Sequence, residues 1–299
     1  MVNVTATSLR TVMSTWYVRV LLGICTIAAS IALYVAVSLA GLNTIIGSFL
    51  LLLVVAGTGM LTESYRLNGS AAAYGLVLNR QTLWFVGIGA MSAIVMLGIL
   101  ALIAIAFGAS FVLQDPGPAA DGVVQHIVRL TFGAATEEVL FRGTIFLAIA
   151  VRFGGPIAIL GSSVVFAVGH AWNPGGVEPL AIVNLFLAGV LLATMIHTKA
   201  SMFMAISFHA VWNVVTSLIF GNVSGISSSA SVASLTTDGV NPTLLWLVSG
   251  PFGIEQGFAT TCVLLVVIIA LNRWDQFDAV VAAARNRTLI AERTHVGVL

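Results

Sequence analysis

The segment Thr131-Phe-Gly-Ala-Ala-Thr-Glu-Glu-Val-Leu-Phe-Arg-Gly143 holds two acids and one base inside a long apolar stretch. An ionised side chain in the centre of a lipid bilayer costs about 2.5–3.5 kcal/mol even on lenient insertion scales. Charged residues at such positions therefore face the interior of a helix bundle and mark a functional site by default. The three candidates in this segment are Glu137, Glu138 and Arg142.

The composition of the whole chain supports a membrane location. Of its 299 residues, 59% are hydrophobic and 8% are charged, whereas about 25% of the residues of soluble proteins are charged. A soluble domain could not bury so much apolar surface, so we expect the lipid bilayer to be one partner of this protein. The net charge of +1 implies nothing about nucleic acid. Because the sequence shows no basic patch and no nucleic-acid motif, we expect no nucleic-acid partner.

Eight apolar stretches approach or exceed the length of about 20 residues that a membrane-spanning helix needs. They lie at about 18–39, 45–61, 83–107, 123–151, 157–171, 180–197, 201–220 and 256–271. We therefore predict an all-α, polytopic integral membrane protein with about eight transmembrane helices in a single membrane domain, residues 1–299. Residues 272–299 would form an amphipathic helix on the cytoplasmic membrane surface.

Lys and Arg residues occur in every second predicted loop, and this pattern indicates how the chain is oriented in the membrane. All of the 12 Lys and Arg residues except Arg129 and Arg142 fall on one side of the membrane when eight helices are counted. Loops rich in Lys and Arg remain in the cytoplasm. We therefore expect a multi-pass protein of a bacterial-type plasma (inner) membrane with both termini cytoplasmic. The Ser- and Gly-rich stretch 221–241 would be a flexible external loop.

Three apolar segments each carry a pair of residues four positions apart, a spacing that puts both residues on one face of a helix. The pairs are Glu138 with Arg142, Phe166 with His170, and His209 with Asn213. Glu137 is turned by about 100° from Glu138 around the helix axis. One glutamate can therefore pair with Arg142 while the other faces a cavity.

These side chains support two kinds of hydrolytic site. A carboxylate and an imidazole can bind and deprotonate a water molecule, while a second imidazole and an amide donate hydrogen bonds to an oxyanion. Alternatively, Glu137, His170 and His209 could bind a divalent metal ion such as zinc and leave one coordination position open. The residues alone do not choose between the two arrangements.

Taken in order, the motifs EExxxR (137–142), FxxxH (166–170) and HxxxN (209–213) resemble those of the CAAX-protease and bacteriocin-processing family of intramembrane endopeptidases, also called CPBP or Abi. The eukaryotic type II CAAX prenyl endopeptidase belongs to that family. The residues that also fit its spacing before the last motif are Phe186, Gly189 and Ser201. The resemblance covers residues 120–220 and implies that residues 123–220 form the catalytic core. It also implies cleavage of peptide bonds in membrane-associated protein or peptide substrates.

The resemblance also implies a role for each motif residue. It implies that Glu137, assisted by His170, is the catalytic carboxylate. It implies that His209 and Asn213 stabilise the oxyanion. The residues in supporting roles are Glu138, Arg142 and Phe166, the first two as a structural ion pair. We favour the metal-free, glutamate-type mechanism because the HExxH pair of zinc proteases is absent from the sequence.

Two functions of other classes fit the same residues. An ion-coupled transporter would use intramembrane carboxylates to relay protons or bind cations, and it would need polar residues on further helices. A non-catalytic membrane scaffold or immunity protein would bind a partner through the same bundle. The remaining histidines, His126, His197 and His295, lie outside these three motifs, and we interpret them as interfacial or solvent-exposed.

Overall fold

In the computed structural model, the described part of the chain comprises residues 75–76, 78–114, 120–173, 178–199 and 201–272, with isolated helical positions between 18 and 47. The α-helices are α4 (Arg80–Ala106), α5 (Ala120–Glu138), α6 (Phe146–Phe153), α7 (Gly155–His170), α8 (Pro179–Lys199), α9 (Met202–Ile219), α10 (Leu245–Val248) and α11 (Phe258–Asn272). The other helices are a π-helix, η2 (Val139–Ile145), and two 3-10 helices, η3 (Pro242–Leu244) and η4 (Gly253–Gln256). The strands are β1 (Ser110–Leu113), β2 (Asn222–Val223), β3 (Ile226–Ser227) and β4 (Ala233–Thr236).

The described helices follow the predicted spans closely. α4, α7, α8, α9 and α11 begin and end within three residues of the predicted stretches, and the predicted fourth span is the continuous run α5–η2–α6. The three helices α4, α8 and α9 are long and apolar enough to cross a membrane. Apart from isolated positions, the first two predicted spans lie outside the described residues, as does the tail after Asn272. The mostly helical class is confirmed, and eight spans remain a prediction.

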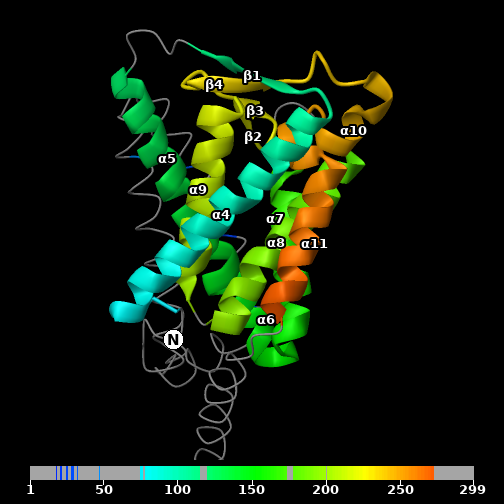
Figure 1. Ribbon diagram of the computed structural model, residues 1–299. Helices are drawn as coiled ribbons and strands as arrows, with labels where there is room; N and C mark the ends of the chain where they lie inside the picture. Colours follow the sequence, from blue (N-terminus) through cyan, green and yellow to red (C-terminus); the bar gives the residue numbers. More distant parts are fainter. Residues whose placement is uncertain are drawn as a thin grey trace, which may run out of the picture.

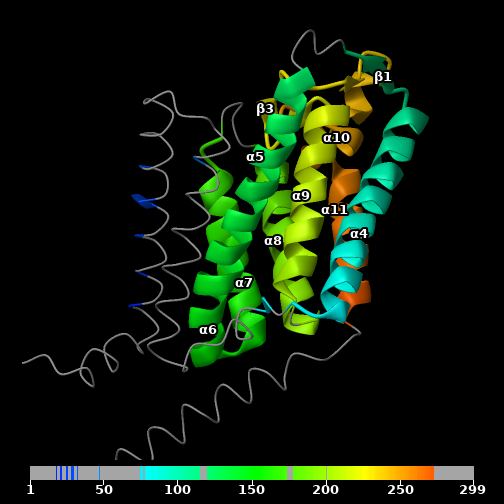
Figure 2. The ribbon, with the colours of Figure 1, turned by 90° about the vertical axis from the view of Figure 1, so that its left-hand side faces the viewer.

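The helices form a bundle with the strands gathered at one end and α6 at the other (Figure 1). α9 packs against α4, α5 and α8, and α8 packs in turn against α7 and α11. The view from the side shows α4 and α11 near one edge of the bundle and α6 and α7 near the other (Figure 2). α9 and α8 are thus the helices through which the two edges are connected.

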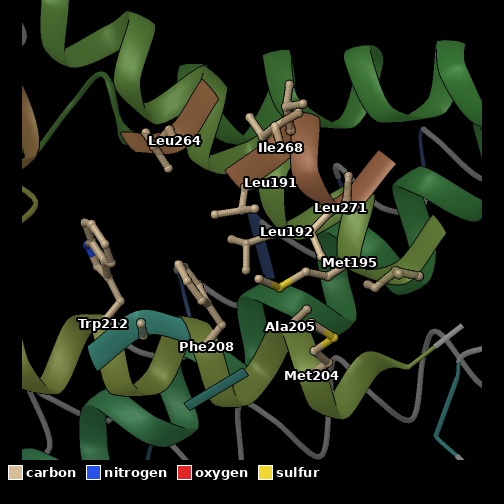
Figure 3. Close-up of a cluster of buried hydrophobic side chains, with 14 of the residues drawn as sticks. Leu191, Leu192, Met195, Met204, Ala205, Phe208, Trp212, Leu264, Ile268 and Leu271 are labelled. Atoms are coloured by element: carbon tan, nitrogen blue, oxygen red, sulfur yellow. The ribbon is translucent and has the colours of Figure 1, made fainter. Parts of the chain in front are cut away.

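The largest buried cluster of apolar side chains joins α4, α8, α9 and α11 (Figure 3). It includes Leu191 and Met195 from α8, Phe208 from α9 and Leu264 from α11, none more than 3% exposed. The outward faces of α4, α7 and α11 also carry exposed large apolar side chains, such as Leu102. Helices that are apolar on all sides are typical of membrane spans, so lipid is the solvent that these outer faces fit.

Local sequence signals set the starts of two of these helices. Before α4, the Asn79 side chain accepts a hydrogen bond from the backbone N–H of Thr82 at 3.0 Å, and the Asn79 N–H donates to the Thr82 hydroxyl at 3.0 Å. This reciprocal pair is a capping box. Before α9, the hydroxyl of Ser201 accepts from the N–H of Met204 at 3.4 Å. The N-cap of α9 determines on which turn its polar residues lie.

The stretch 221–241 differs from its prediction as a flexible loop. β2 pairs antiparallel with β3, and β4 pairs antiparallel with β1, which precedes α5. In the second pair, Ser110 lies opposite Thr236 and Leu113 opposite Ala233. Because β1 is more than 100 residues away in the sequence, the Ser- and Gly-rich composition of 221–241 gave no sign of this partner.

Gly189 allows α8 to approach α7 very closely. A methyl group on Gly189 would lie 2.9 Å from both Cα and Cβ of Ser163 on α7. The carbonyl oxygen of Gly189 also accepts a hydrogen bond from Nη2 of Arg142 at 3.2 Å. The glycine therefore sets the distance between the two helices and supports a buried charge, which explains why a small residue is needed at this position.

The substitution Gly189→Ala should destabilise the bundle, because the Ser163 backbone would have to move to admit the methyl group. We expect a loss of about 1–3 kcal/mol, as in other overpacked cores, seen as a lower midpoint of thermal unfolding in detergent micelles. The matched control is Gly98→Ala on the exposed face of α4, where a methyl group would meet no atom within 4 Å. Equal unfolding midpoints for the two variants would contradict the close approach of α7 and α8.

Candidate active site

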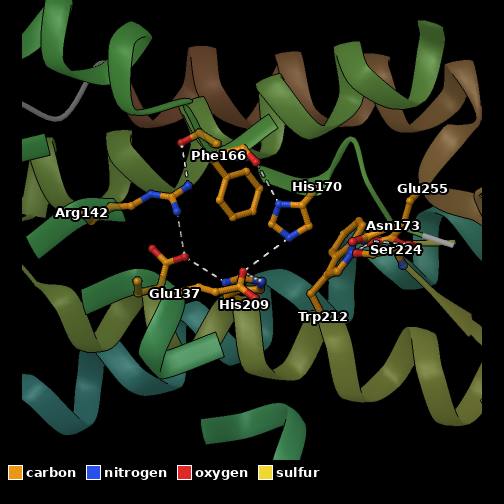
Figure 4. A network of polar contacts seen from close by, with 11 residues as sticks. Glu137, Arg142, Phe166, His170, Asn173, His209, Trp212, Ser224 and Glu255 are labelled. Atoms are coloured by element: carbon orange, nitrogen blue, oxygen red, sulfur yellow. Dashed lines mark hydrogen bonds and ion pairs between the residues drawn. The ribbon is translucent and has the colours of Figure 1, made fainter. Parts of the chain in front are cut away.

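Charged and polar side chains from α5, η2, α7 and α9 meet inside the bundle (Figure 4). Glu137 and Glu138 lie at the end of α5, and Arg142 lies in η2. His170 is the last residue of α7, and His209 lies near the middle of α9. Three segments that are separate in the sequence therefore contribute to one cluster.

Glu137 faces both imidazole rings. Its Oε2 atom is 3.5 Å from Nε2 of His170 and 3.8 Å from Nε2 of His209. The Glu137 side chain is 35% exposed, but Oε2 itself is buried and has no hydrogen-bond partner among the described residues. Because buried polar atoms nearly always have a partner, this oxygen marks the point where a water molecule or a substrate atom would bind.

The backbone determines which nitrogen of His170 carries hydrogen. Nδ1 lies 2.9 Å from the carbonyl oxygen of Phe166, and a carbonyl oxygen can only accept a hydrogen bond. Nδ1 is therefore the donor, and in the neutral ring Nε2 directs its lone pair towards Glu137. The four-residue spacing of the FxxxH motif has a simple reason, since the carbonyl oxygen four residues earlier orients the imidazole.

Glu138 and Arg142 form the ion pair that their spacing predicts, and both side chains are fully buried. Oε1 of Glu138 accepts from Nη1 of Arg142 at 3.1 Å and is 2.8 Å from Nδ1 of His209. Since an ionised carboxylate can only accept, Nδ1 of His209 is the donor, and its Nε2 turns towards the other glutamate. His209 is a third partner of the ion pair that the sequence spacing did not indicate.

Phe166 lies between Arg142 and His170 (Figure 4). The guanidinium carbon of Arg142 is 4.5 Å from the centre of the Phe166 ring, and the His170 ring centre is 4.3 Å from it. An aromatic face attracts a cation and offsets part of the hydration that a buried guanidinium loses. Phe166 therefore supports the arginine and the histidine at the same time.

The π-helix η2 continues α5 directly after the two glutamates. All seven of its residues are buried, Arg142 among them. A π-helical turn is wider than an α-helical one and is frequent at functional sites. Here it carries the guanidinium deep into the bundle while Glu138 remains within hydrogen-bond distance.

A cavity of about 530 Å³, counting its open mouth, begins at the two imidazoles. Asn213 lines it together with His170 and His209, so the HxxxN motif directs both of its polar residues to the same space. The apolar residues of the lining are Phe166, Leu185, Ala188, Leu192, Phe208 and Leu264. Among the described residues, the lining contains one carboxylate, Glu255, and no Lys or Arg. The cavity therefore suits an apolar group placed next to a polar, reactive end.

The motifs did not identify Glu255, which lies in η4. Its Oε1 accepts a hydrogen bond from Nε1 of Trp212 at 2.8 Å, and its Oε2 accepts one from the backbone N–H of Ser224. Burial raises the pKa of the Glu255 carboxyl, while these two hydrogen bonds act in the opposite direction. In the sequence, the one feature that could have pointed to Glu255 is its position directly before an apolar span. Glu255 is one of 11 acidic residues in the chain, so this feature alone did not single it out.

The described residues contain no group of three or more His, Cys, Asp or Glu side chains arranged to hold a metal ion. The donor set proposed from the sequence for zinc was Glu137, His170 and His209. In the structure, Oε2 of Glu137 lies 3.5 Å from Nε2 of His170 and 3.8 Å from Nε2 of His209. A metal site at these residues remains a prediction.

His126, interpreted from the sequence as interfacial, has defined partners. Its Nε2 is 2.6 Å from the hydroxyl of Ser217 on α9, and its Nδ1 is 3.0 Å from Nη2 of Arg129. Arginine can only donate, so Nδ1 accepts and Nε2 donates to the hydroxyl. The imidazole therefore has no lone pair with which to deprotonate Ser217, and the three residues connect α5 to α9 rather than forming a nucleophilic triad.

Residues 119–215 match a protein family described as Type II CAAX prenyl endopeptidase Rce1-like. This match confirms the resemblance that the three motifs indicate, and all three motifs lie within it. The family comprises intramembrane proteases, and the apolar helices are those of an integral membrane protein. No curated protein and no solved structure matches the chain.

The substitution Glu138→Gln should destabilise the protein strongly, because it leaves the buried Arg142 cation without an anionic partner. Breaking one side of a buried ion pair costs about 3–5 kcal/mol. The double variant Glu138→Gln/Arg142→Met should recover most of that loss, since it leaves no unpaired charge. Thermal unfolding in detergent measures both, with the exposed Glu178→Gln as the control. A double variant as unstable as the sum of the single variants would contradict the pairing.

Proposed function

We propose that the protein is an intramembrane endopeptidase that hydrolyses peptide bonds of membrane-associated proteins or peptides. The observation that carries the proposal is the approach of Oε2 of Glu137 to Nε2 of His170 and of His209. This buried oxygen has no hydrogen-bond partner among the residues with a described position. Flanked by two imidazole nitrogens, it is suited to bind and deprotonate water. The family match over residues 119–215 supports the same reaction class.

In the proposed first step, a water molecule hydrogen-bonded to Glu137 and to Nε2 of His170 attacks the carbonyl carbon of the scissile peptide bond. As the C–O bond forms, one proton of the water passes to the carboxylate–imidazole pair. Because Nδ1 of His170 already donates to the Phe166 carbonyl oxygen, Nε2 is the nitrogen that receives a proton. The pair later returns this proton to the leaving amine, and the C–N bond breaks.

The proposed oxyanion stabilisers are His209 and Asn213, which line the cavity together. Nδ1 of His209 donates to Glu138, so a hydrogen on Nε2 would give the ring a positive charge, and the Glu138 carboxylate would balance it. The amide of Asn213 supplies a second, neutral donor. Donors fixed in advance around the oxyanion lower the barrier because they need no reorganisation during the reaction.

The substrate class we propose is a peptide segment with an apolar side chain near the cleaved bond. The cavity next to the imidazoles is mostly apolar and contains no Lys or Arg that could bind a carboxylate. An endopeptidase acting on membrane-associated chains fits this lining. We further propose a multi-pass topology in a bacterial-type plasma membrane with cytoplasmic termini, on the distribution of Lys and Arg in the sequence.

The transporter alternative is supported less well. Charge relay across a membrane needs polar groups on several spans, yet α4 contains no acid or base after Arg80. The scaffold alternative gives no role to the approach of Glu137 to two imidazoles. The scaffold function would survive Glu137→Gln, whereas hydrolysis would not.

The substitution Glu137→Gln should abolish cleavage of the substrate, because it removes the base. Membrane insertion and the yield of purified protein should be unchanged, because the size of the side chain stays the same. Wild-type protein, Glu137→Gln and the matched control Glu178→Gln would be reconstituted into liposomes. Each would be given a quenched fluorescent peptide ending in a farnesylated CAAX sequence and the same peptide without the farnesyl group. New N-termini in isolated membranes would report cleavage of other substrates.

We expect wild type and Glu178→Gln to cleave at least one of these substrates and Glu137→Gln to lose about 10³-fold or more in rate, the range for the loss of a base that generates the nucleophile. Wild-type rates in Glu137→Gln would remove Glu137 from the chemistry. Absence of any cleavage by the wild type would reject the peptidase function itself.

Metal content distinguishes the two hydrolytic mechanisms. For the metal-free mechanism we expect purified, active protein to contain less than stoichiometric metal and to keep its activity in a chelator such as EDTA. Elemental analysis by inductively coupled plasma mass spectrometry measures the first quantity. Stoichiometric zinc that is lost in His170→Ala, together with inhibition by the chelator, would instead make Glu137, His170 and His209 ligands of a catalytic metal.

A further inference from the structure

We propose that Glu255 is a positioning residue of the active site. Its side chain connects α9 to the end of α7 across the cavity. The inference rests on the peptidase function proposed above, although the contacts that support it can be tested without activity. Glu255 lies outside residues 119–215, so the family match gives it no role.

Each carboxylate oxygen of Glu255 binds a different element. Oε1 accepts from the indole Nε1 of Trp212 on α9 at 2.8 Å, and Oε2 accepts from the N–H of Ser224, which lies in the turn between β2 and β3. Two N–H donors therefore converge on one side chain. A glutamine of the same shape has a single acceptor oxygen, so a carboxylate is needed to bind both.

The turn that contains Ser224 continues the connection to α7. The Ser224 carbonyl oxygen accepts from Nδ2 of Asn173 at 3.0 Å, and the Asn173 N–H donates to the carbonyl oxygen of His170 at 3.2 Å. Figure 4 shows Trp212, Glu255, Ser224 and Asn173 together on the side of His170 opposite Arg142. A chain of hydrogen bonds thus runs from Trp212 to the residue that ends α7.

The conformation of the turn depends on these contacts. Ser224 has a φ of +50°, in the left-handed region that residues other than glycine adopt at a cost. The hydrogen bonds of its N–H to Glu255 and of its carbonyl to Asn173 hold both sides of this strained residue. Without the carboxylate, the turn would have less to keep it against the end of α7.

The backbone of Glu255 is fixed independently of its side chain. Asn184 on α8 donates from Nδ2 to the carbonyl oxygens of Glu255 at 2.8 Å and Gly257 at 3.0 Å. Its Oδ1 accepts from the hydroxyl of Thr261 on α11 at 2.6 Å. Because α8 and α11 hold η4 in place, the carboxylate is a rigid point from which Trp212 and Ser224 are positioned.

Trp212 transmits this position to the chemistry. It follows His209 by three residues and precedes Asn213 directly, so all three lie within about one helical turn of α9. His209, Trp212, Asn213, His170 and Glu255 all line the same cavity. The hydrogen bonds from Trp212 through Glu255 to the end of α7 therefore fix the rings of His170 and His209 relative to each other. Glu138 holds His209 from the opposite side.

The test compares four forms of the full chain in detergent micelles: wild type, Glu255→Gln, Trp212→Phe and their double variant. Asp238→Asn is the matched control, since Asp238 is an exposed acid in the same 221–241 stretch. Protein labelled with 5-fluorotryptophan gives a fluorine NMR signal for Trp212, identified by its loss in Trp212→Phe. The rate constant kcat and the KM are measured on the peptide that the wild type cleaves.

We expect Glu255→Gln to shift the fluorine signal of Trp212 and to lower kcat by about tenfold to a hundredfold, the range for a small misplacement of catalytic groups, with a smaller change in KM. Trp212→Phe should lower kcat similarly, and the double variant should be no slower than the slower single variant, because the two residues act as one unit. Asp238→Asn should match the wild type in signal and rate.

An unchanged Trp212 signal in Glu255→Gln would overturn the proposal, whatever the activity. So would a kcat within about twofold of wild type, less than a single weak hydrogen bond is worth, or fully additive losses in the double variant. If Glu255→Gln does not fold, Trp212→Phe alone decides, since it removes the indole N–H and keeps an aromatic side chain. If the wild type cleaves nothing, the peptidase function fails, and the fluorine signal still decides whether the connection exists.

Discussion

The buried ion pair between Glu138 and Arg142 constrains the arrangement of the whole site. Neither side chain reaches the surface, and an unpaired charge in such a position would cost several kcal/mol. Glu138 also binds His209 on α9, and Arg142 also binds the carbonyl oxygen of Gly189 on α8. The pair can therefore be satisfied only when α5, η2, α8 and α9 adopt their observed relation.

The two adjacent glutamates show how one residue type can take two roles. Glu138 is fully buried and has strong partners, whereas Glu137 is 35% exposed and has a buried oxygen with no hydrogen-bond partner in the part of the chain that the structure describes. The difference follows from the helix, which turns consecutive side chains about 100° apart. The pair that holds the bundle together thus leaves the neighbouring carboxylate directed at the imidazoles.

The cavity is lined by residues within the family match, 119–215, and by residues that follow it in the sequence. The end that contains His170 and His209 is formed by residues within 119–215, while Ser224, Glu255 and Leu264 come from the part of the chain that follows. Strand pairing and the hydrogen bonds of Asn184 hold this later part on the bundle. The outer wall of the cavity is therefore formed by residues that follow the family match.

By itself, the sequence determined the helical class, the approximate bounds of α4, α7, α8, α9 and α11, and the pairing of Glu138 with Arg142. It could do so because hydropathy and four-residue spacing are local properties of a helix. Only the tertiary structure decided that His209 is a third partner of the ion pair, that 221–241 contains strands, and that Glu255 belongs to the cavity. Each of these depends on contacts between residues far apart in the sequence, such as the hydrogen bond between Glu255 and Trp212. A local pattern carries no information about such contacts, because they arise when the helices pack.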